Sequence, residues 1–318
     1  MRTRTIAMLS AALCAGAVVS ALPARARPAP PAEEPKPIPK IENAFLDGFV
    51  GSWDVAFEGM GSTGSGVSKV SKAAGGTTLL QETQVTVMGR NFYAVTVTRV
   101  DETGKGARLW RFDTSSGVDM TAFKGTLGEG GIEAKSESGV SVSFKKKGAA
   151  YETTIAKGAE TVFTSTYTKA AKDVVLETPN APKDGILPAM IGTWDATGEW
   201  VMAVEPIKVA GTSTFRWALG GSMILHDYDR TSSKGPNRAL GAWRWPTAGS
   251  AKSWWFETGQ LDPMPAEGAL TDTAWHGKGT FPDGAVIGLE WTKKGEGFEM
   301  RYEMGGQTAG HETYTKKK

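Results

Sequence analysis

This chain has almost no cysteine and almost no net charge. Cys14 is the only cysteine among 318 residues, and 36 basic residues face 34 acidic ones. Cys14 lies inside the N-terminal apolar run, and the chain after this run has no thiol. Disulfides and thiolate chemistry are therefore excluded from that part of the chain. The near balance of charge does not indicate the basic excess that a nucleic-acid-binding surface needs, so no nucleic-acid partner is expected.

Long apolar runs are also absent after the first 26 residues, so no stable membrane insertion is expected once those residues are removed. Arg2 and Arg4 precede an uncharged apolar stretch over 6–22, and an Ala-x-Ala site ends at Ala26. This pattern predicts a signal peptide over 1–26, cleavage after Ala26, and a periplasmic or secreted protein.

A lipid anchor on Cys14 is the rival interpretation of the same leader. Leu13 stands where a lipoprotein signal needs a small residue, and Cys14 lies midway along the apolar run. Both features favour a cysteine that is discarded with the signal peptide. The loss of three leader arginines reduces the 36 basic residues to 33, against 34 acidic ones, which is a net charge of about −1.

Proline is concentrated in the segment that follows the leader. Residues 27–40 hold six prolines in fourteen positions and no hydrophobic cluster. This composition is typical of an extended polyproline II linker. The remaining chain, from residue 41, is long enough for two domains of about 140 residues each.

A repeat divides that remaining chain into two copies. The sequence FVGSWDVAFEG at 49–59 returns as MIGTWDATGEW at 190–200. So long a period indicates a domain duplication, with a first unit over 41–180 and a second over 181–318. Three further landmarks recur in the same order: Gly75-Gly76 with Gly220-Gly221, Trp-Arg-Phe at 110–112 with Trp-Arg-Trp at 243–245, and Tyr-Thr-Lys at 167–169 with 314–316.

The periodicity within each copy is that of β-strands. Apolar Phe298, Met300 and Tyr302 alternate with charged residues, which is typical of an antiparallel strand with one buried face. Helical spacing is confined to 41–50 and 184–191, just before each Gly-x-Trp. We therefore predict an all-β fold of two tandem antiparallel lipocalin-like barrels, each preceded by a short helix.

Several of these motifs carry a resemblance to known families. A helix followed by Gly-x-Trp on the first strand resembles the calycin, or lipocalin-like, pattern. The second copy also resembles the bacterial domain of unknown function family 1579, over most of 186–318, and the first is similar to a degenerate copy of it. The resemblance implies a barrel fold and leaves the activity open. The matching residues are IGTWDATGEW (191–200), FRWALGGSMILHDYD (215–229), SWWFETG (253–259) and HETYTKKK (311–318).

Nine of the eleven tryptophans lie at or after Trp194, so any ligand is expected in the second unit. Trp254 and Phe256 share one face of their strand and Trp255 takes the other, so rings occupy both faces. Core packing and a ligand-lined barrel interior both account for this pattern. A ligand-lined interior would draw on the candidate binding residues Arg216, Trp217, His226, Tyr228, Trp255 and Trp291.

The three histidines, His226, His276 and His311, also lie in the second unit. No nucleophile elbow and no zinc-binding histidine pair accompany them, so no catalytic residue, metal or cofactor is assigned. We expect an exported, non-catalytic protein that binds a small apolar or aromatic molecule, with its oligomeric state left open. The alternatives are an enzyme that uses His226 or His311, a haem protein that binds through His311, and a structural or interaction protein of the envelope.

Overall fold

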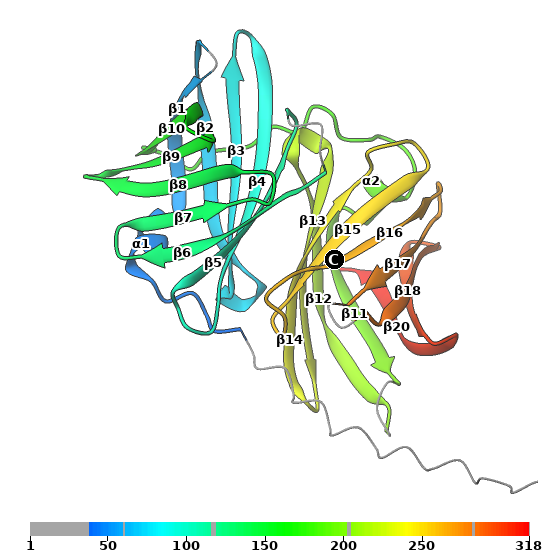
Figure 1. Ribbon diagram of the computed structural model, residues 1–318. Helices are drawn as coiled ribbons and strands as arrows, with labels where there is room; N and C mark the ends of the chain where they lie inside the picture. Colours follow the sequence, from blue (N-terminus) through cyan, green and yellow to red (C-terminus); the bar gives the residue numbers. More distant parts are fainter. Residues whose placement is uncertain (1–37, 60, 116–118, 202–204, 282–283, 318) are drawn as a thin grey trace, which may run out of the picture. The chain divides into compact units, whose positions relative to one another are not determined.

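The computed structural model describes residues 38–317 except 60, 116–118, 202–204 and 282–283. This part of the chain belongs to one compact unit and forms two closed antiparallel barrels of ten strands each (Figure 1). The predicted signal peptide and most of the proline-rich linker lie outside the described residues. None of the helices in the described part has the length and apolar character needed to cross a membrane.

The first barrel begins with a short helix, as predicted. The side chain of Asn43 caps helix α1 (Ala44–Phe49) by accepting hydrogen bonds from two backbone N–H groups. The strands follow in a meander, which the pairing of the first strand with the tenth closes. They are β1 (Gly51–Gly59), β2 (Ser62–Ala73), β3 (Thr78–Val87), β4 (Arg90–Val100), β5 (Gly106–Asp113), β6 (Thr121–Gly128), β7 (Gly131–Lys135), β8 (Val140–Lys147), β9 (Ala150–Lys157) and β10 (Glu160–Lys169).

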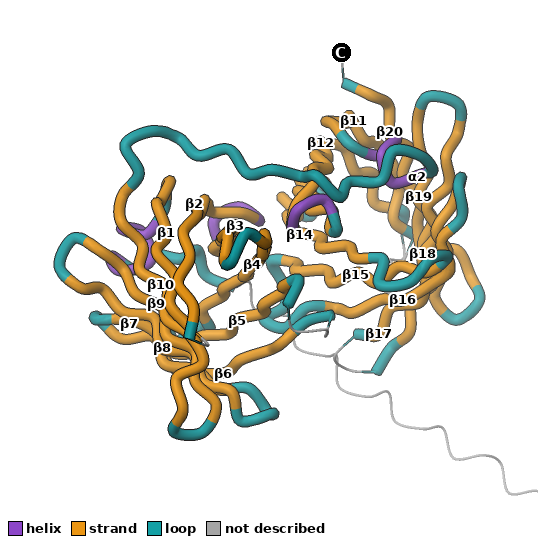
Figure 2. Tube along the Cα trace, turned by 90° about the horizontal axis from the view of Figure 1, so that it is seen from above, coloured by secondary structure: helices purple, strands orange, loops and turns teal. Residues whose placement is uncertain are grey.

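The second barrel repeats this order after residues 170–185, which form the long loop that joins β10 to α2 in Figure 2. It begins with helix α2 (Ile186–Met190), and its first and last strands pair in the same way. The strands are β11 (Gly192–Trp200), β12 (Ile207–Ala218), β13 (Met223–Ser232), β14 (Gly235–Arg244), β15 (Ser250–Glu257), β16 (Met264–Leu270), β17 (Ala274–Thr280), β18 (Val286–Lys294), β19 (Gly297–Met304) and β20 (Gln307–Lys316).

The two Gly-x-Trp motifs hold equivalent places at the helix end of each barrel. The indole N–H of Trp53 donates to the carbonyl of Phe49 over 2.8 Å, and that of Trp194 donates to the carbonyl of Met190 over 2.7 Å. Each tryptophan therefore ties the first strand to the helix before it. This confirms the repeat that these motifs predict.

One predicted correspondence in the repeat is wrong. Trp110 and Phe112 lie on β5, so their counterparts are Trp254 and Phe256 on β15, the fifth strand of the second barrel. The residues 243–245 instead lie at the end of the fourth strand and just beyond it. A three-residue match is too short to establish equivalence in a segment so rich in aromatic residues.

A hydrophobic core between the barrels involves these same rings. Trp110 packs edge-on against Phe256 with ring centroids 5.2 Å apart, and Phe112 packs edge-on against Trp254 at 5.0 Å. The contacts are reciprocal, as in the interface of a symmetric dimer. All four rings are buried, so the outer faces of the central strands act as a third core that the two barrels share.

Two arginines at equivalent positions add polar contacts to this interface. Arg99, the tenth residue of β4, donates to the backbone carbonyls of Glu257 and Gln260. Arg244, the tenth residue of β14, donates to the carbonyl of Asp119 over 2.8 Å. Each barrel thus contributes one arginine that satisfies backbone acceptors of the other.

The paired glycines that mark the repeat are required at this interface. Gly75 and Gly220 lie in the tight turns after β2 and β12, with φ of 68° and 65°. A Cβ on Gly75 would lie 2.8 Å from Cδ of Arg238, and a Cβ on Gly220 would lie 2.6 Å from the ring of Tyr93. Both the backbone conformation and the approach of the other barrel therefore favour glycine.

Candidate functional site

The second barrel contains a cavity of about 150 Å³ at one end of its strands. Its lining includes Trp200, the last residue of β11, Glu257, the last of β15, and Met264, the first of β16. Helix α2 precedes the first residue of β11 and so lies at the other end. The cavity therefore occupies the open end of the barrel, away from the helix.

Aromatic rings come from seven of the fifteen residues that line this cavity. Tyr228 and Trp255 meet edge to face with centroids 5.0 Å apart, and Trp243 and Trp291 do so at 5.8 Å. Aromatic walls with a few polar groups are typical of small-molecule sites. The lining residues are Trp200, Tyr228, Asn237, Trp243, Ser253, Trp255, Glu257, Met264, Phe281, Ile287, Leu289, Trp291, Met300, Tyr302 and Ala309.

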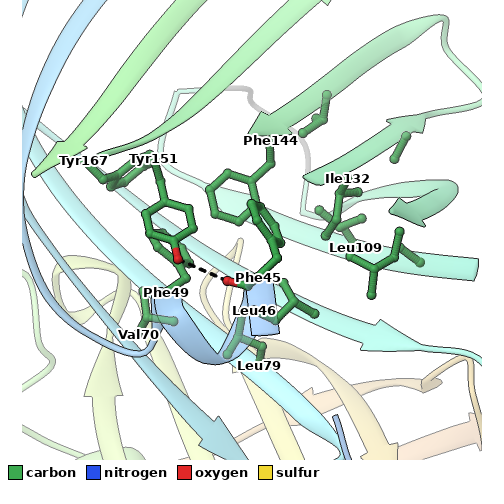
Figure 3. Close-up of a cluster of buried hydrophobic side chains, with 14 of the residues drawn as sticks. Phe45, Leu46, Phe49, Val70, Leu79, Leu109, Ile132, Phe144, Tyr151 and Tyr167 are labelled. Atoms are coloured by element: carbon green, nitrogen blue, oxygen red, sulfur yellow. Dashed lines mark hydrogen bonds between the residues drawn. The ribbon is translucent and has the colours of Figure 1, made fainter. Parts of the chain in front are cut away.

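Side chains fill most of the interior of the first barrel, in contrast to that of the second. The space inside the first barrel is about 30 Å³, which leaves room for little more than one or two water molecules. Figure 3 shows the aromatic side chains that fill it, with Phe45 and Phe49 from α1 close to Phe144 and Tyr151 from β8 and β9. The hydroxyl of Tyr151 donates to the carbonyl of Phe45 over 3.2 Å, which holds the helix against the core.

A buried ion pair inside the second barrel adjoins the cavity. Arg230 and Glu312 are both fully buried, and Nη2 of the arginine lies 2.8 Å from Oε2 of the carboxylate. The hydroxyls of Tyr228 and Tyr302 donate to Oε1 of Glu312 over 2.8 and 3.0 Å, and that of Tyr314 donates to Oε2 over 3.0 Å. Both carboxylate oxygens are therefore satisfied, and the charge of Glu312 is balanced.

The three tyrosines of this network are held in their neutral form. Burial, and next the negative charge of Glu312, raise the pKa of Tyr228, Tyr302 and Tyr314 well above the ordinary tyrosine value. Their hydroxyls are thus donors to Glu312 throughout the physiological range. Tyr228 and Tyr302 also line the cavity, so they present ring surface to it while their hydroxyls are already used.

His226 lies behind the cavity wall, outside the lining. Its Nε2 is 2.7 Å from Oγ of Ser213, and its ring stacks on Phe215 with centroids 3.9 Å apart. Burial, assisted by the nearby charge of Arg230, lowers the pKa of His226 well below its usual value, so the imidazole is neutral. Ser213 and His226 are both fully buried, which gives this pair no access to a substrate in the cavity.

The structure brings together three of the six candidate binding residues, Tyr228, Trp255 and Trp291, as lining of the cavity. Arg216 points away from the interior and forms an ion pair with Glu82 of the first barrel at 2.7 Å. Trp217 packs against Trp245, away from the lining, with ring centroids 5.7 Å apart.

His311 does not serve as an interior ligand. Its side chain is exposed on β20, whereas the side chain of the next residue, Glu312, points inward and is fully buried. The alternative of haem binding through His311 therefore receives no support from the position of this side chain. Among the described residues, no group of three or more histidines, cysteines or carboxylates is arranged to hold a metal ion.

Sequence reasoning missed Glu257 and Asn237, the polar pair in the cavity. Nδ2 of Asn237 donates to Oε1 of Glu257 over 3.0 Å. Burial raises the pKa of Glu257 above the ordinary glutamate value. Alternation from Trp255 could have identified Glu257, because residues two apart on a strand face the same side.

We expect Glu257→Gln to stabilise the free protein at neutral pH. The pKa of Glu257 is higher in the folded protein than in the unfolded chain, so ionising this carboxyl costs more in the folded protein. The free energy of unfolding of the wild type therefore falls as the pH rises from the ordinary glutamate pKa to the raised one. The advantage of the variant over wild type should therefore be present at about pH 7 and vanish below about pH 4. Urea unfolding at both pH values measures it, and a variant less stable than wild type at neutral pH would contradict the burial argument.

The sequence matches no protein-family model and no curated protein. Among solved structures, the chain is similar to a Nostoc punctiforme protein of unknown function from domain of unknown function family 3598. The identity is 11%, over 85% of this chain and 96% of that one, with a TM-score of 0.28. It is also similar to a mutant of transferrin-binding protein B from Haemophilus parasuis, at 7% identity over 83% and 74% of the two chains, with a TM-score of 0.21. No conclusion about function follows from TM-scores this low.

Proposed function

We propose that the second barrel binds a small molecule whose apolar part is about the size of one aromatic ring. The contrast between the two interiors, about 150 Å³ in the second barrel and about 30 Å³ in the first, supports this proposal. An apolar protein cavity of about 150 Å³ is known to hold benzene. A larger molecule would place its ring in the cavity and extend the remainder through the open end.

The affinity would come from burial of the ligand ring against Trp255, Trp291 and Tyr228. Such burial contributes about 25 cal/mol for each Å² of apolar surface removed from water. Polar groups of the lining would then set the orientation of the ligand. The first barrel, with its filled interior, would act as a folded partner through the shared core.

Catalysis by His226 receives less support from the geometry. Its neutral imidazole is fully buried against Ser213, and the buried carboxylate of Glu312 is taken by Arg230 and three tyrosines. A histidine and a carboxylate that converge in one cavity would be needed for acid–base chemistry.

The sequence supports two further parts of the proposal. The leader over 1–26 favours export to the periplasm or beyond the cell. The motifs within 186–318 favour kinship of the second barrel with domain of unknown function family 1579.

Replacing Trp255 by leucine should weaken ligand binding about tenfold, because one aromatic wall of the cavity is lost. Trp217→Leu is the matched control, since Trp217 belongs to the same barrel and packs against Trp245 instead of lining the cavity. Calorimetric titration with benzyl alcohol and benzylammonium measures the affinity, and urea unfolding measures stability in parallel. Equal losses of affinity in the two variants, or no binding of either probe to the wild type, would refute the proposed site.

A further inference from the structure

The cavity contains two hydrogen-bond acceptors that the protein leaves without a full set of donors. Because Nδ2 of Asn237 donates to Glu257, the Oδ1 of Asn237 is buried with no hydrogen-bond partner among the described residues. Exchange of the two amide atoms would set this oxygen against the carboxylate, which is unfavourable. Buried acceptors without donors are rare in native proteins, so a donor on a bound molecule would satisfy this oxygen.

Glu257 also carries the charge that the cavity leaves unpaired. The other buried carboxylate, Glu312, is neutralised by Arg230, whereas Glu257 forms no ion pair with a described residue. Arg99 favours the ionised form of Glu257 from the interface, but its Nη1 is bonded to the backbone carbonyl of that residue. A carboxylate in an aromatic cavity is stabilised by a positive charge that enters with the ligand.

The aromatic wall suits the same charge. Trp255 lies two residues before Glu257 on β15, so both side chains face the interior. A cation within about 6 Å of a tryptophan ring centroid is attracted by the face of the ring, more strongly where water is excluded. The carboxylate, the amide oxygen and the rings therefore all favour a positively charged head group that donates hydrogen bonds.

Two residues of the lining also have donors without a partner. The indole N–H groups of Trp243 and Trp291 are buried and have no partner among the described residues. A ligand that reaches these groups would need a neutral acceptor, such as a hydroxyl or carbonyl, to satisfy them. An anionic acceptor is disfavoured by the unpaired carboxylate of Glu257.

We infer that the ligand is an amine cation, a primary or substituted ammonium group on a ring-sized apolar body, bound by Glu257, Asn237 Oδ1 and the tryptophan wall. This inference rests on the proposed function of the second barrel. It adds the charge and donor character of the head group, which the volume of the cavity does not supply.

Three probes that share one ring and differ in head group test it: benzylammonium, benzyl alcohol and benzoate. Calorimetric titration of the full mature protein at neutral pH should rank them in that order of affinity. Benzylammonium should bind about tenfold tighter than benzyl alcohol or more, as expected for a charge-assisted hydrogen bond. Glu257→Gln should remove that advantage, so that the variant binds benzylammonium and benzyl alcohol with affinities within about twofold of one another.

Glu267→Gln is the matched control, because Glu267 is an exposed carboxylate on β16 of the same barrel. It removes one negative charge without touching the cavity, so the affinity for benzylammonium should stay the same. Equal binding of benzyl alcohol and benzylammonium, or tighter binding of benzoate, would overturn the amine inference while leaving the proposed function intact. Failure of all three probes to bind would overturn both.

Discussion

Replacing Glu312 by leucine is expected to lower the free energy of unfolding by about 3–5 kcal/mol. Glu312 and Arg230 are fully buried at 2.8 Å from one another, so the leucine leaves the charge of Arg230 alone in the barrel interior. The hydroxyls of Tyr302 and Tyr314 lose their acceptor in the same variant. An unpaired buried charge is far more costly than a broken pair at the surface, because water cannot replace the lost partner. Urea unfolding of the two proteins measures the difference.

Two further variants show whether burial is the cause. Arg230→Met combined with Glu312→Leu should recover part or all of the loss, because no charge is then left in the interior. Glu133→Gln breaks the exposed pair between Glu133 and Lys145, which is 2.7 Å long, and should cost about 1 kcal/mol or less. A loss as small as this for Glu312→Leu would mean that water reaches Arg230 from the cavity, and the buried-pair argument would fail.

Truncation of Trp110 or of Trp254 to alanine is expected to cost about 3–5 kcal/mol in each case. The two tryptophans lie in different barrels, yet both are buried in the core that the barrels share. Their edge-on partners, Phe256 and Phe112, are also equivalent residues, so the two losses should be similar. The wild type should unfold in one transition, because neither barrel buries its outer aromatic residues alone. Urea unfolding followed by circular dichroism and by fluorescence measures both quantities.

Phe57→Ala is the control for these interface variants. Phe57 is half-buried in the first barrel against Phe163, with ring centroids 5.3 Å apart, and takes no part in the shared core. It should lower stability by less and leave the single transition unchanged. Two separate transitions in the wild type would contradict the shared core, as would losses of very different size for Trp110→Ala and Trp254→Ala.

The fold of each barrel could be predicted because its signals are local. Gly-x-Trp after a short helix is visible within about ten residues, and alternation shows that Trp255 faces away from Trp254. Three of the six candidate residues line the cavity for this reason. Arg216 does not, because it lies on the opposite face of its strand from Trp217 and points away from the interior. Trp217 and His226 do not, because alternation does not show which stretch of a strand adjoins open space. The match of residues 243–245 to 110–112 gave a wrong correspondence, since three residues do not establish which strand of the sheet they belong to.

The sequence alone determined the duplication, the strand content and the short helix before each Gly-x-Trp motif, because each is visible in short segments of the chain. Only the tertiary structure decided the pairing of Arg230 with Glu312, the core shared by the barrels and the placement of Asn237 beside Glu257. These contacts join residues on different strands, 82 residues apart in the case of Arg230 and Glu312. Their partners are set by strand order and register across a closed sheet. The cavity likewise arises from the difference between two packed interiors, which is a property of side chains in three dimensions.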